Sequence, residues 1–299
     1  MRKHLVIART GSCSLHHEWL LGSESRNWDL HLAPYEPLGR QPADVEVQEV
    51  IPGPKWSGLD ELLNLWDGWR EYEYVWLPDD DIRATSATIN RLFEAARLAE
   101  FELFAPALTE PSFFAHFDTM RNSRFHGRWG GFVEIMCPGF SRSALEKLLF
   151  TLELSETGWG WGLDSVWPKL LDYRNVGVLD GVSVTHTRPV GAMRDPDLRR
   201  RVLAEGERLL STFGCQQVHT TFGAFDSRFE PMDRSSEELL GDLTSGWQYL
   251  VDRDPRILEW IISFQRSDPH CLEYPGEGTP GGGYIPGEAY VPGGDFVRA

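Results

Sequence analysis

Three consecutive aspartates follow an apolar run in the stretch EYEYVWLPDDDIR, Glu71 to Arg83. The run before Asp79, Asp80 and Asp81 is rich in aromatic and β-branched residues, which favour a buried strand. Adjacent carboxylates repel one another, so three of them at a strand end need positive charge nearby. A hard cation such as Mg²⁺ or Mn²⁺ would supply it and could in turn hold a diphosphate. A solvated, Asp-rich turn is the structural alternative.

Three later stretches contain residues that transfer protons or bind metals. Glu134 lies in the apolar segment GGFVEIMCPGF, and Asp164 falls just inside a helix start in GWGWGLDSVW. His186 ends the strand-like run VSVTH. Each has an ordinary structural explanation: a strand-edge charge, a first-turn acid favoured by the helix dipole, and a core histidine. Their order along the chain, after the aspartates, favours a functional site.

Together these stretches resemble the nucleotide-sugar glycosyltransferases of the GT-A type. They are most similar to the domain of unknown function 707 family, whose plant members are labelled lysine-ketoglutarate reductase trans-splicing related. The matching pieces, between Leu5 and Gly191, are DDDI, GFVEIMCPGFSRSA, WGWGLDSVW and NVGVLDGVSVTHTRPVG. The resemblance implies an enzyme that moves a sugar from a nucleotide-sugar donor to a glycan or other hydroxyl acceptor, in bacterial polysaccharide biosynthesis.

The resemblance also implies a metal site made by Asp81, Asp79 and His186. An imidazole ligand suits Mn²⁺ better than Mg²⁺, because nitrogen is a softer donor than a carboxylate oxygen. Since the middle residue, Asp80, is also an aspartate, the sequence leaves open which two of the three bind metal. Asp79, Asp80 and Arg83 are expected to contact the donor.

The first strand and its loop, VIARTGSCS, are expected to carry the nucleotide, because ligands of parallel sheets bind beyond the carboxyl ends of the strands. Thr10, Gly11 and Ser12 would approach the base or ribose. Lys55 would reach the ribose or a phosphate, although a solvated lysine is the ordinary alternative. The sequence has no GxxxxGK[ST] pattern, so this is not a Walker loop.

Asp164 is the candidate general base, and Glu134 is the rival base or an acceptor-binding group. A base that takes the proton of an acceptor hydroxyl during direct displacement would give inversion at the anomeric carbon. A retaining reaction would not need it. Trp159, Trp161 and Arg188 are candidate acceptor contacts, with core packing and surface solubility as their ordinary roles.

Two other functions fit the same residues. A metal-dependent phosphohydrolase could use Asp79 as its nucleophile. A glycan-binding protein could keep the sheet and an aromatic pocket without turnover, and the 12 tryptophans of the chain suit that alternative.

The elements that must position these residues alternate between strands and helices. Apolar runs predict strands at residues 4–8, 47–51, 73–77, 102–108, 177–180 and 182–186. Helices are expected to begin at Ser57, at Thr85 or Ser86, and at Ser141 or Ser143. This alternation predicts an α/β, GT-A-like and Rossmann-like domain, with a mostly parallel sheet flanked by helices.

The pattern changes after Gly191. Residues 1–191 are expected to form the nucleotide-sugar-binding and catalytic domain, residues 192–272 a helical C-terminal extension, and residues 273–299 an extended Pro/Gly-rich tail. Pro196 suits a first helical turn, and two more helices should be separated at Asp254 and Pro255. The segment VHTTFGAFDSRFEP between the helices is either an acceptor-side loop or aromatic packing. The tail offers a surface for homo-oligomer contact.

Composition limits the class of protein. The formal charge of −16 argues against broad binding to nucleic acid or to an anionic membrane. The four cysteines form no CxxC pair, which fits a reducing compartment. The sequence contains no apolar run long enough for a signal-peptide core or a membrane span, so a cytoplasmic protein is expected.

Overall fold

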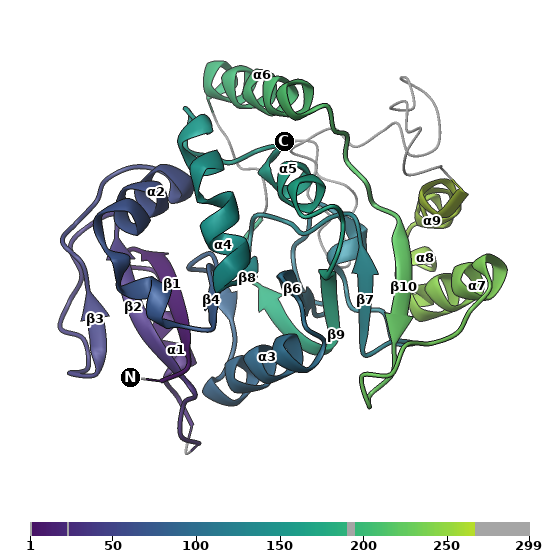
Figure 1. Cartoon of the computed structure of the whole chain (residues 1–299), viewed down its shortest axis with the longest axis horizontal. Coiled ribbons are helices and arrows are strands. Elements are labelled where there is room, and N and C mark those ends of the chain that lie inside the picture. Colours follow the sequence, from purple (N-terminus) through teal and green to yellow (C-terminus); the bar gives the residue numbers. More distant parts are fainter. Residues whose placement is uncertain (1, 23, 190–194, 267–299) are drawn as a thin grey trace.

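The computed structural model describes residues 2–22, 24–189 and 195–266. Within them, one sheet runs across the molecule with the strand order β10-β7-β9-β6-β8-β4-β1-β2-β3, and helices cover it (Figure 1). The predicted tail, residues 273–299, and the end of the predicted extension lie outside the described residues. No helix of the described ranges is long and apolar enough to cross a membrane.

The N-terminal half of the sheet is parallel. It consists of β1 (His4–Thr10), β2 (Trp28–Pro34), β3 (Val45–Val47) and β4 (Tyr74–Trp76). All seven residues of β1 are buried, as expected for a strand covered on both faces. The strand predicted at residues 47–51 lies earlier, at Val45–Val47, although the backbone N–H groups of Gln48 and Ile51 still donate to the carbonyls of Leu32 and Pro34 in β2. Strand β2 was not predicted, because its Asp, His and Pro residues interrupt the apolar pattern of a strand.

The second half of the sheet is mixed. It consists of β6 (Leu103–Leu108), β7 (Gly127–Gly130), β8 (Gly139–Ser141), β9 (Val176–His186) and β10 (Thr221–Phe225), with β5 (Ile82–Arg83) paired to the end of β9. Along the described sheet order, β7 and β8 run against the direction that the other strands share. The two strands predicted at residues 177–180 and 182–186 are one strand, β9, which pairs with β6 through a register shift.

Helices on the first 170 residues pack on both faces of the sheet. They are α1 (His16–Trp19), α2 (Lys55–Leu65), η1 (Asp67–Glu71), α3 (Ser86–Leu98), η2 (Phe117–Thr119), α4 (Arg142–Leu148), η3 (Leu149–Leu154) and α5 (Leu163–Leu170). The predicted caps at Thr85 and Ser141 are confirmed, since each side chain accepts a backbone N–H. Ser57 is not a cap: α2 begins two residues earlier, after the extended Pro54.

The C-terminal part contains α6 (Pro196–Phe213), α7 (Ser236–Gly246), α8 (Gln248–Val251) and α9 (Arg256–Arg266). Pro196 occupies the first helical turn after the cap Asp195, as predicted. A break at Asp254 and Pro255 precedes α9, also as predicted, although a short α8 stands before it. Helices α7 to α9 lie beside β10 at the edge of the sheet (Figure 1). The predicted α/β class, a mostly parallel sheet flanked by helices with a helical addition, is confirmed.

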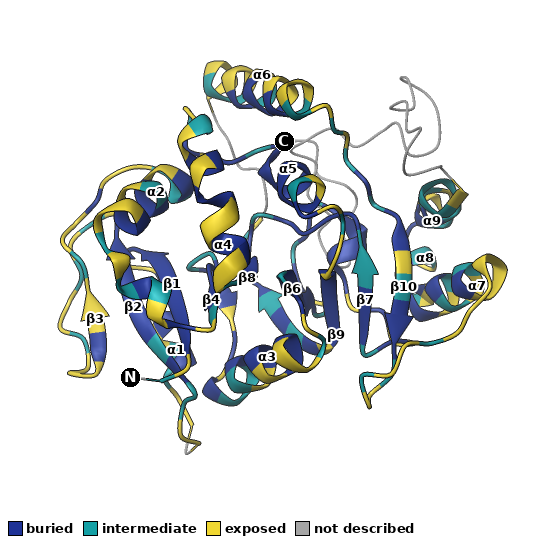
Figure 2. Ribbon diagram, in the orientation of Figure 1, coloured by how far each residue is buried: buried dark blue, intermediate teal, exposed yellow. Residues whose placement is uncertain are grey.

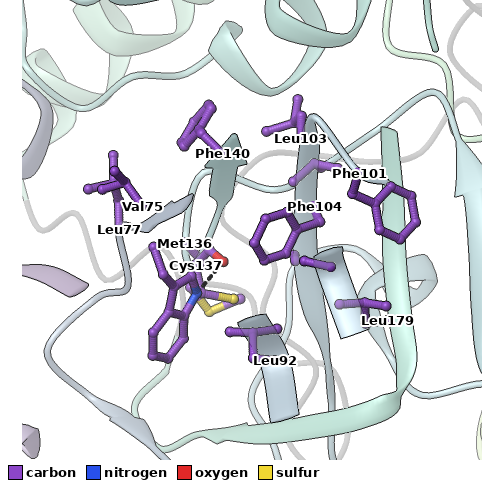
Figure 3. Close-up of a cluster of buried hydrophobic side chains, with 14 of the residues drawn as sticks. Val75, Leu77, Leu92, Phe101, Leu103, Phe104, Met136, Cys137, Phe140 and Leu179 are labelled. Carbon is purple, nitrogen blue, oxygen red and sulfur yellow. Dashed lines mark hydrogen bonds between the residues drawn. The ribbon is translucent and has the colours of Figure 1, made fainter. Parts of the chain in front are cut away.

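The core fixes the end of β4 against the segment that enters β8. Figure 2 shows the buried residues running through the sheet, and Figure 3 shows Phe104 and Phe140 among the apolar side chains of this region. The indole N–H of the buried Trp76 donates to the carbonyl of Cys137 at 2.9 Å. The backbone N–H of Asp79 donates to the carbonyl of Met136 at 2.8 Å. The aspartate cluster therefore begins at a rigid point of the fold.

Candidate functional site

The predicted site residues gather where strands β1, β4 and β9 end. Thr10 is the last residue of β1, His186 is the last of β9, and the aspartates follow β4. Because these strands share one direction, their carboxyl ends meet at one edge of the sheet, where α/β proteins bind ligands. The carbonyl of Asp80 accepts the backbone N–H of Leu15 at 2.7 Å, which joins the loop after β1 to the aspartate segment.

Asp81 and His186 contact each other directly. The Nε2 atom of His186 lies 3.2 Å from Oδ2 of the buried Asp81. The other ring nitrogen, Nδ1, donates to the carbonyl of Phe113 at 2.9 Å, which fixes the ring and aims Nε2 at Asp81. Burial alone would lower the pKa of His186, but the hydrogen bond and charge of Asp81 outweigh burial and hold that pKa above its ordinary value.

This pair fits a metal ligand set. The second carboxylate oxygen of Asp81, Oδ1, is buried and has no hydrogen-bond partner among the described residues. A buried carboxylate oxygen without a partner carries a free-energy cost that a bound cation would remove. The bond from His186 to Phe113 is the outer contact that orients metal-binding histidines.

Asp79 is held by Lys55. The ammonium group, at the start of α2, lies 2.7 Å from Oδ1 of Asp79. It also donates to the carbonyls of Ile135 and Met136 at 2.8 Å each, so its three N–H groups all have acceptors. Burial raises the pKa of Asp79 in spite of the lysine charge. Lys55 therefore ties α2 to the aspartate cluster and to the segment that carries Glu134.

Asp80 faces different partners. It accepts the hydroxyl of Tyr35 at 2.9 Å and Nη1 of Arg188 at 3.1 Å. Arg188 also donates to the carbonyl of Cys13 at 2.5 Å. Asp80 and Arg188 thus connect the N-terminal loop to the chain just after β9. Asp79 and Asp81 pair instead with Lys55 and His186.

Glu134 and Asp164 are two buried carboxyl groups with raised pKa values. Burial is the main cause in both, and it raises the pKa of Glu134 to about 8 and that of Asp164 to about 7. The Oε2 atom of Glu134 has no partner among the described residues, and Asp164 accepts the hydroxyl of Ser165 at 3.2 Å. The charges of Asp79 and His186 act on Glu134, as does the charge of Asp164, so these groups share one region.

The N-terminal loop residues lie close to Tyr35. Thr10 is buried, and its hydroxyl has no partner among the described residues. A Cβ on Gly11 would fall 2.4 Å from the hydroxyl oxygen of Tyr35, so only glycine allows this approach. The backbone N–H of Ser12 donates to Glu36 at 2.5 Å.

Three predicted contacts lie away from the aspartates or in packing positions. Arg83 makes an exposed ion pair with Glu18. Trp159 is 38% exposed, whereas the half-buried Trp161 packs against Gly206 of α6. The alternation of Gly and Trp has a backbone reason, because the three glycines of this loop all adopt positive φ: Gly158, Gly160 and Gly162.

His116, Asp118 and His219 form a group that no sequence pattern predicted. One donor atom from each of the three side chains lies within 4.8 Å of the others, and this group could hold a metal ion. Asp118 also acts on the pKa of both Glu134 and Asp164, which places the group beside the acidic region. No local spacing could reveal it, since about a hundred residues separate Asp118 from His219. The only hint was the segment VHTTF, interpreted above as an acceptor-side loop or aromatic packing.

Comparisons with known proteins leave the family open. No family model matches the chain and no curated protein matches it, so membership of the domain of unknown function 707 family stays a prediction. Among solved structures, residues 1–349 of S. aureus TarS are similar with a TM-score of 0.43 and 12% identity, over 89% of this chain and 87% of that one.

Two further TarS structures are similar at the same level. The 1–349 fragment in complex with UDP has a TM-score of 0.42 and 10% identity, over 86% of this chain and 75% of that one. A structure described as S. aureus TarS has a TM-score of 0.41 and 11% identity, over 89% of this chain and 53% of that one. Likeness this weak carries no argument about activity, so the function must be argued from the site.

Proposed function

We propose that this protein is a metal-dependent glycosyltransferase of the GT-A type, which moves a sugar from a nucleotide sugar to a hydroxyl acceptor, such as a growing bacterial polysaccharide. One observation carries the proposal. The partnerless oxygen of Asp81 and the oriented ring of His186 share one sheet edge with two buried carboxyl groups whose pKa values lie near neutrality. A cation site next to a titratable base is the combination that sugar transfer from a diphosphate requires.

Asp81 and His186 would hold the ion, with Asp79 as the third ligand. The nitrogen donor favours Mn²⁺ over Mg²⁺. When bound, the cation would stabilise the negative charge that develops on the leaving nucleoside diphosphate. Lys55 keeps Asp79 and the Glu134 segment in place, so we assign it a positioning role next to the donor. Thr10, Gly11, Ser12 and Asp80 remain donor-side candidates, and their contacts to Tyr35, Glu36 and Arg188 shape that side of the site.

The two buried carboxyl groups differ in their suitability as a base. The hydroxyl of Ser165 donates to Asp164 and stabilises its charged form, whereas Oε2 of Glu134 has no partner among the described residues, so burial favours the neutral form of Glu134 more strongly. We therefore assign Asp164 as the general base. It takes the proton of the acceptor hydroxyl while that oxygen bonds to the anomeric carbon, and the bond to the diphosphate breaks with its electron pair on the diphosphate. The configuration is inverted. The neutral Glu134 would donate a hydrogen bond to a sugar oxygen, and Trp159 offers an exposed ring for stacking.

The phosphohydrolase alternative fits the contacts less well. Its nucleophile, Asp79, has Oδ1 occupied by an ion pair with Lys55, and its raised pKa lowers the fraction of charged carboxylate that could attack. Release of nucleoside diphosphate that requires an acceptor would separate transfer from hydrolysis. Saturable glycan binding in the presence of a chelator would instead support a binding protein.

The test is a thermal-shift panel of UDP, GDP, CDP and dTDP sugars, each with Mn²⁺ and with a chelator. A ligand at 100 times its Kd stabilises the folded state by about 2.7 kcal/mol, so one nucleotide series should raise Tm only with Mn²⁺. Asp81→Asn should abolish that increase, while Asp67→Asn, whose side chain is 82% exposed, should preserve it. Equal shifts in wild type and Asp81→Asn would refute the metal assignment.

A further inference from the structure

His116, Asp118 and His219 come from two segments far apart in sequence. His116 immediately precedes η2, Asp118 lies within it, and His219 stands two residues before β10. His116 and Asp118 are each 9% exposed, and the side chain of His219 is 8% exposed. The fold therefore brings two imidazoles and one carboxylate together in a nearly dry place.

The hydrogen bond between Asp118 and His219 uses only one of the two carboxylate oxygens of Asp118. Oδ2 of Asp118 lies 2.8 Å from Nδ1 of His219, and because a carboxylate only accepts, Nδ1 is the donor; in the neutral ring Nε2 then carries the lone pair. The other oxygen of Asp118, Oδ1, is buried and has no hydrogen-bond partner among the described residues. This orphaned oxygen is independent of the clustering itself, and a cation is the partner that would satisfy it.

A small pocket lies beside the group, and aromatic rings pack around His219. The pocket is partly open to solvent and is lined by Asp118, Gly131, Phe132, His219 and Thr220, among others. The ring of His219 packs against Phe132 at 4.4 Å and Phe264 at 4.8 Å between centroids.

The nearest fixed cation does not exclude a metal. Arg128 donates to the backbone carbonyl of Asp118 at 3.0 Å, but its guanidinium is also paired with the buried Asp180 at 2.8 Å. The positive charge of Arg128 is thus compensated by Asp180. The side chain of Asp118 makes its ion pair with His219 instead.

We infer that His116, Asp118 and His219 bind a divalent transition-metal ion at a second site, separate from Asp81 and His186. Two imidazoles and a carboxylate suit Zn²⁺ and Co²⁺ better than Mg²⁺, and Zn²⁺ binds more tightly than Mn²⁺ to such ligands. Ligands about 2.1 Å from a tetrahedral ion lie about 3.4 Å apart, so donors that lie within 4.8 Å of one another would close in by up to about 1.4 Å on binding. Three protein ligands would leave a coordination position for water or another ligand. The ion would also fasten η2 to the entry of β10.

The experiment uses the full chain with Asp81→Asn, so that the first metal site cannot contribute. The protein carries no affinity tag and is treated with a chelator beforehand, so that it starts free of metal. Zn²⁺ is titrated against a chromophoric chelator. One Zn²⁺ per chain should bind, and adding His219→Gln or Asp118→Asn should weaken the affinity by roughly 100-fold. His126→Gln, which removes a half-buried histidine outside the group, should leave the affinity unchanged.

A second measurement tests the site without any substitution in the group, so that misfolding of a variant cannot explain the result. In the Asp81→Asn chain, Co²⁺ should give the visible absorption of a low-coordinate site, and one equivalent of Zn²⁺ should remove it. Absence of this absorption, or equal Zn²⁺ affinity with and without His219→Gln, would overturn the inference. Neither readout involves a nucleotide, so failure of the donor-site proposal would leave this result unaffected.

Discussion

At the scale of residues, the three consecutive aspartates have three different partners. Asp79 pairs with Lys55, Asp80 with Arg188 and Asp81 with His186. Their mutual repulsion is therefore offset by Lys55 at the start of α2 and by His186 and Arg188 at and just after the end of β9. A single metal ion, the sequence-based explanation, is not needed to hold all three. The cation site that we propose involves Asp81 first, because its second oxygen is the one without a partner.

Asp164→Asn should lower kcat for sugar transfer by about 10²- to 10⁴-fold, because it removes the base. The donor Kd should stay unchanged. In the wild type, kcat should rise with pH through about 7, as Asp164 loses its proton. Steady-state kinetics across pH, with donor binding measured separately, check this prediction.

Ser165→Ala provides the matched variant for Asp164. The hydroxyl of Ser165 donates to the carboxylate and favours its charged form, so its loss should raise the pKa of Asp164 further. The acid limb of the kcat profile should then move to higher pH. An unmoved limb would mean that Asp164 does not control it.

Glu134→Gln should stabilise the protein increasingly as pH rises. The pKa of Glu134 is raised from 4.5 to about 8, so between these pH values the unfolded chain releases a proton that the folded chain retains. The free energy of unfolding of the wild type therefore falls through this window, by as much as roughly 4 to 5 kcal/mol. The Tm difference between Glu134→Gln and wild type should grow from pH 4.5 to 8. A difference independent of pH would contradict the raised pKa.

At the scale of elements, close approach between strands depends on glycine. A Cβ on Gly177 of β9 would lie 1.9 Å from the backbone carbonyl oxygen of Arg128 on β7. Backbone cannot move aside as a side chain can, so the two strands would have to separate. β7 contributes Arg128 and leads into the segment with Glu134, and its pairing to β9 thus matters for the site.

Gly177→Ala should lower the free energy of unfolding by about 3 kcal/mol or more. The matched control is Gly241→Ala on α7, where nothing lies within 4 Å of the new methyl group. That change should stabilise the protein by about 0.5 to 1 kcal/mol, as alanine does in an exposed helix. Urea denaturation measures both. Similar effects of the two substitutions would show that β7 and β9 are not tightly packed.

At the scale of the whole molecule, the sheet does not end where the predicted catalytic domain ends. β10 pairs with β7, and its Phe225 is fully buried, with its ring 6.0 Å from that of Phe101. Trp247, after α7, donates to the carbonyl of Met120 at 2.9 Å. The C-terminal part therefore completes both the sheet and the core around η2.

A chain that ends at Gly214 should lose cooperative folding. It would expose the edge of β7 and the apolar surface under Phe225, and exposed edges of this kind promote aggregation. We expect low soluble yield and no sharp thermal transition, measured by size-exclusion chromatography and circular dichroism. A truncated chain that melts cooperatively at the wild-type Tm would show that residues 1–214 fold independently.

The sequence by itself determined the elements whose signals are local. Strands β1, β4 and β6, the caps at Thr85 and Ser141, and the place of Asp164 in a first helical turn depend on neighbours within a few residues. It did not determine β2, which carries polar residues and takes its place in the sheet by pairing with β1 and β3.

The candidate site divides in the same way. The residue types of Asp81, Glu134 and His186 indicated chemistry, but only the tertiary structure decided their partners. Burial raises the pKa of Glu134 and Asp164, and burial depends on segments distant in sequence. The group of His116, Asp118 and His219 was invisible beforehand for the same physical reason, because contact between η2 and the entry of β10 exists only in the folded chain.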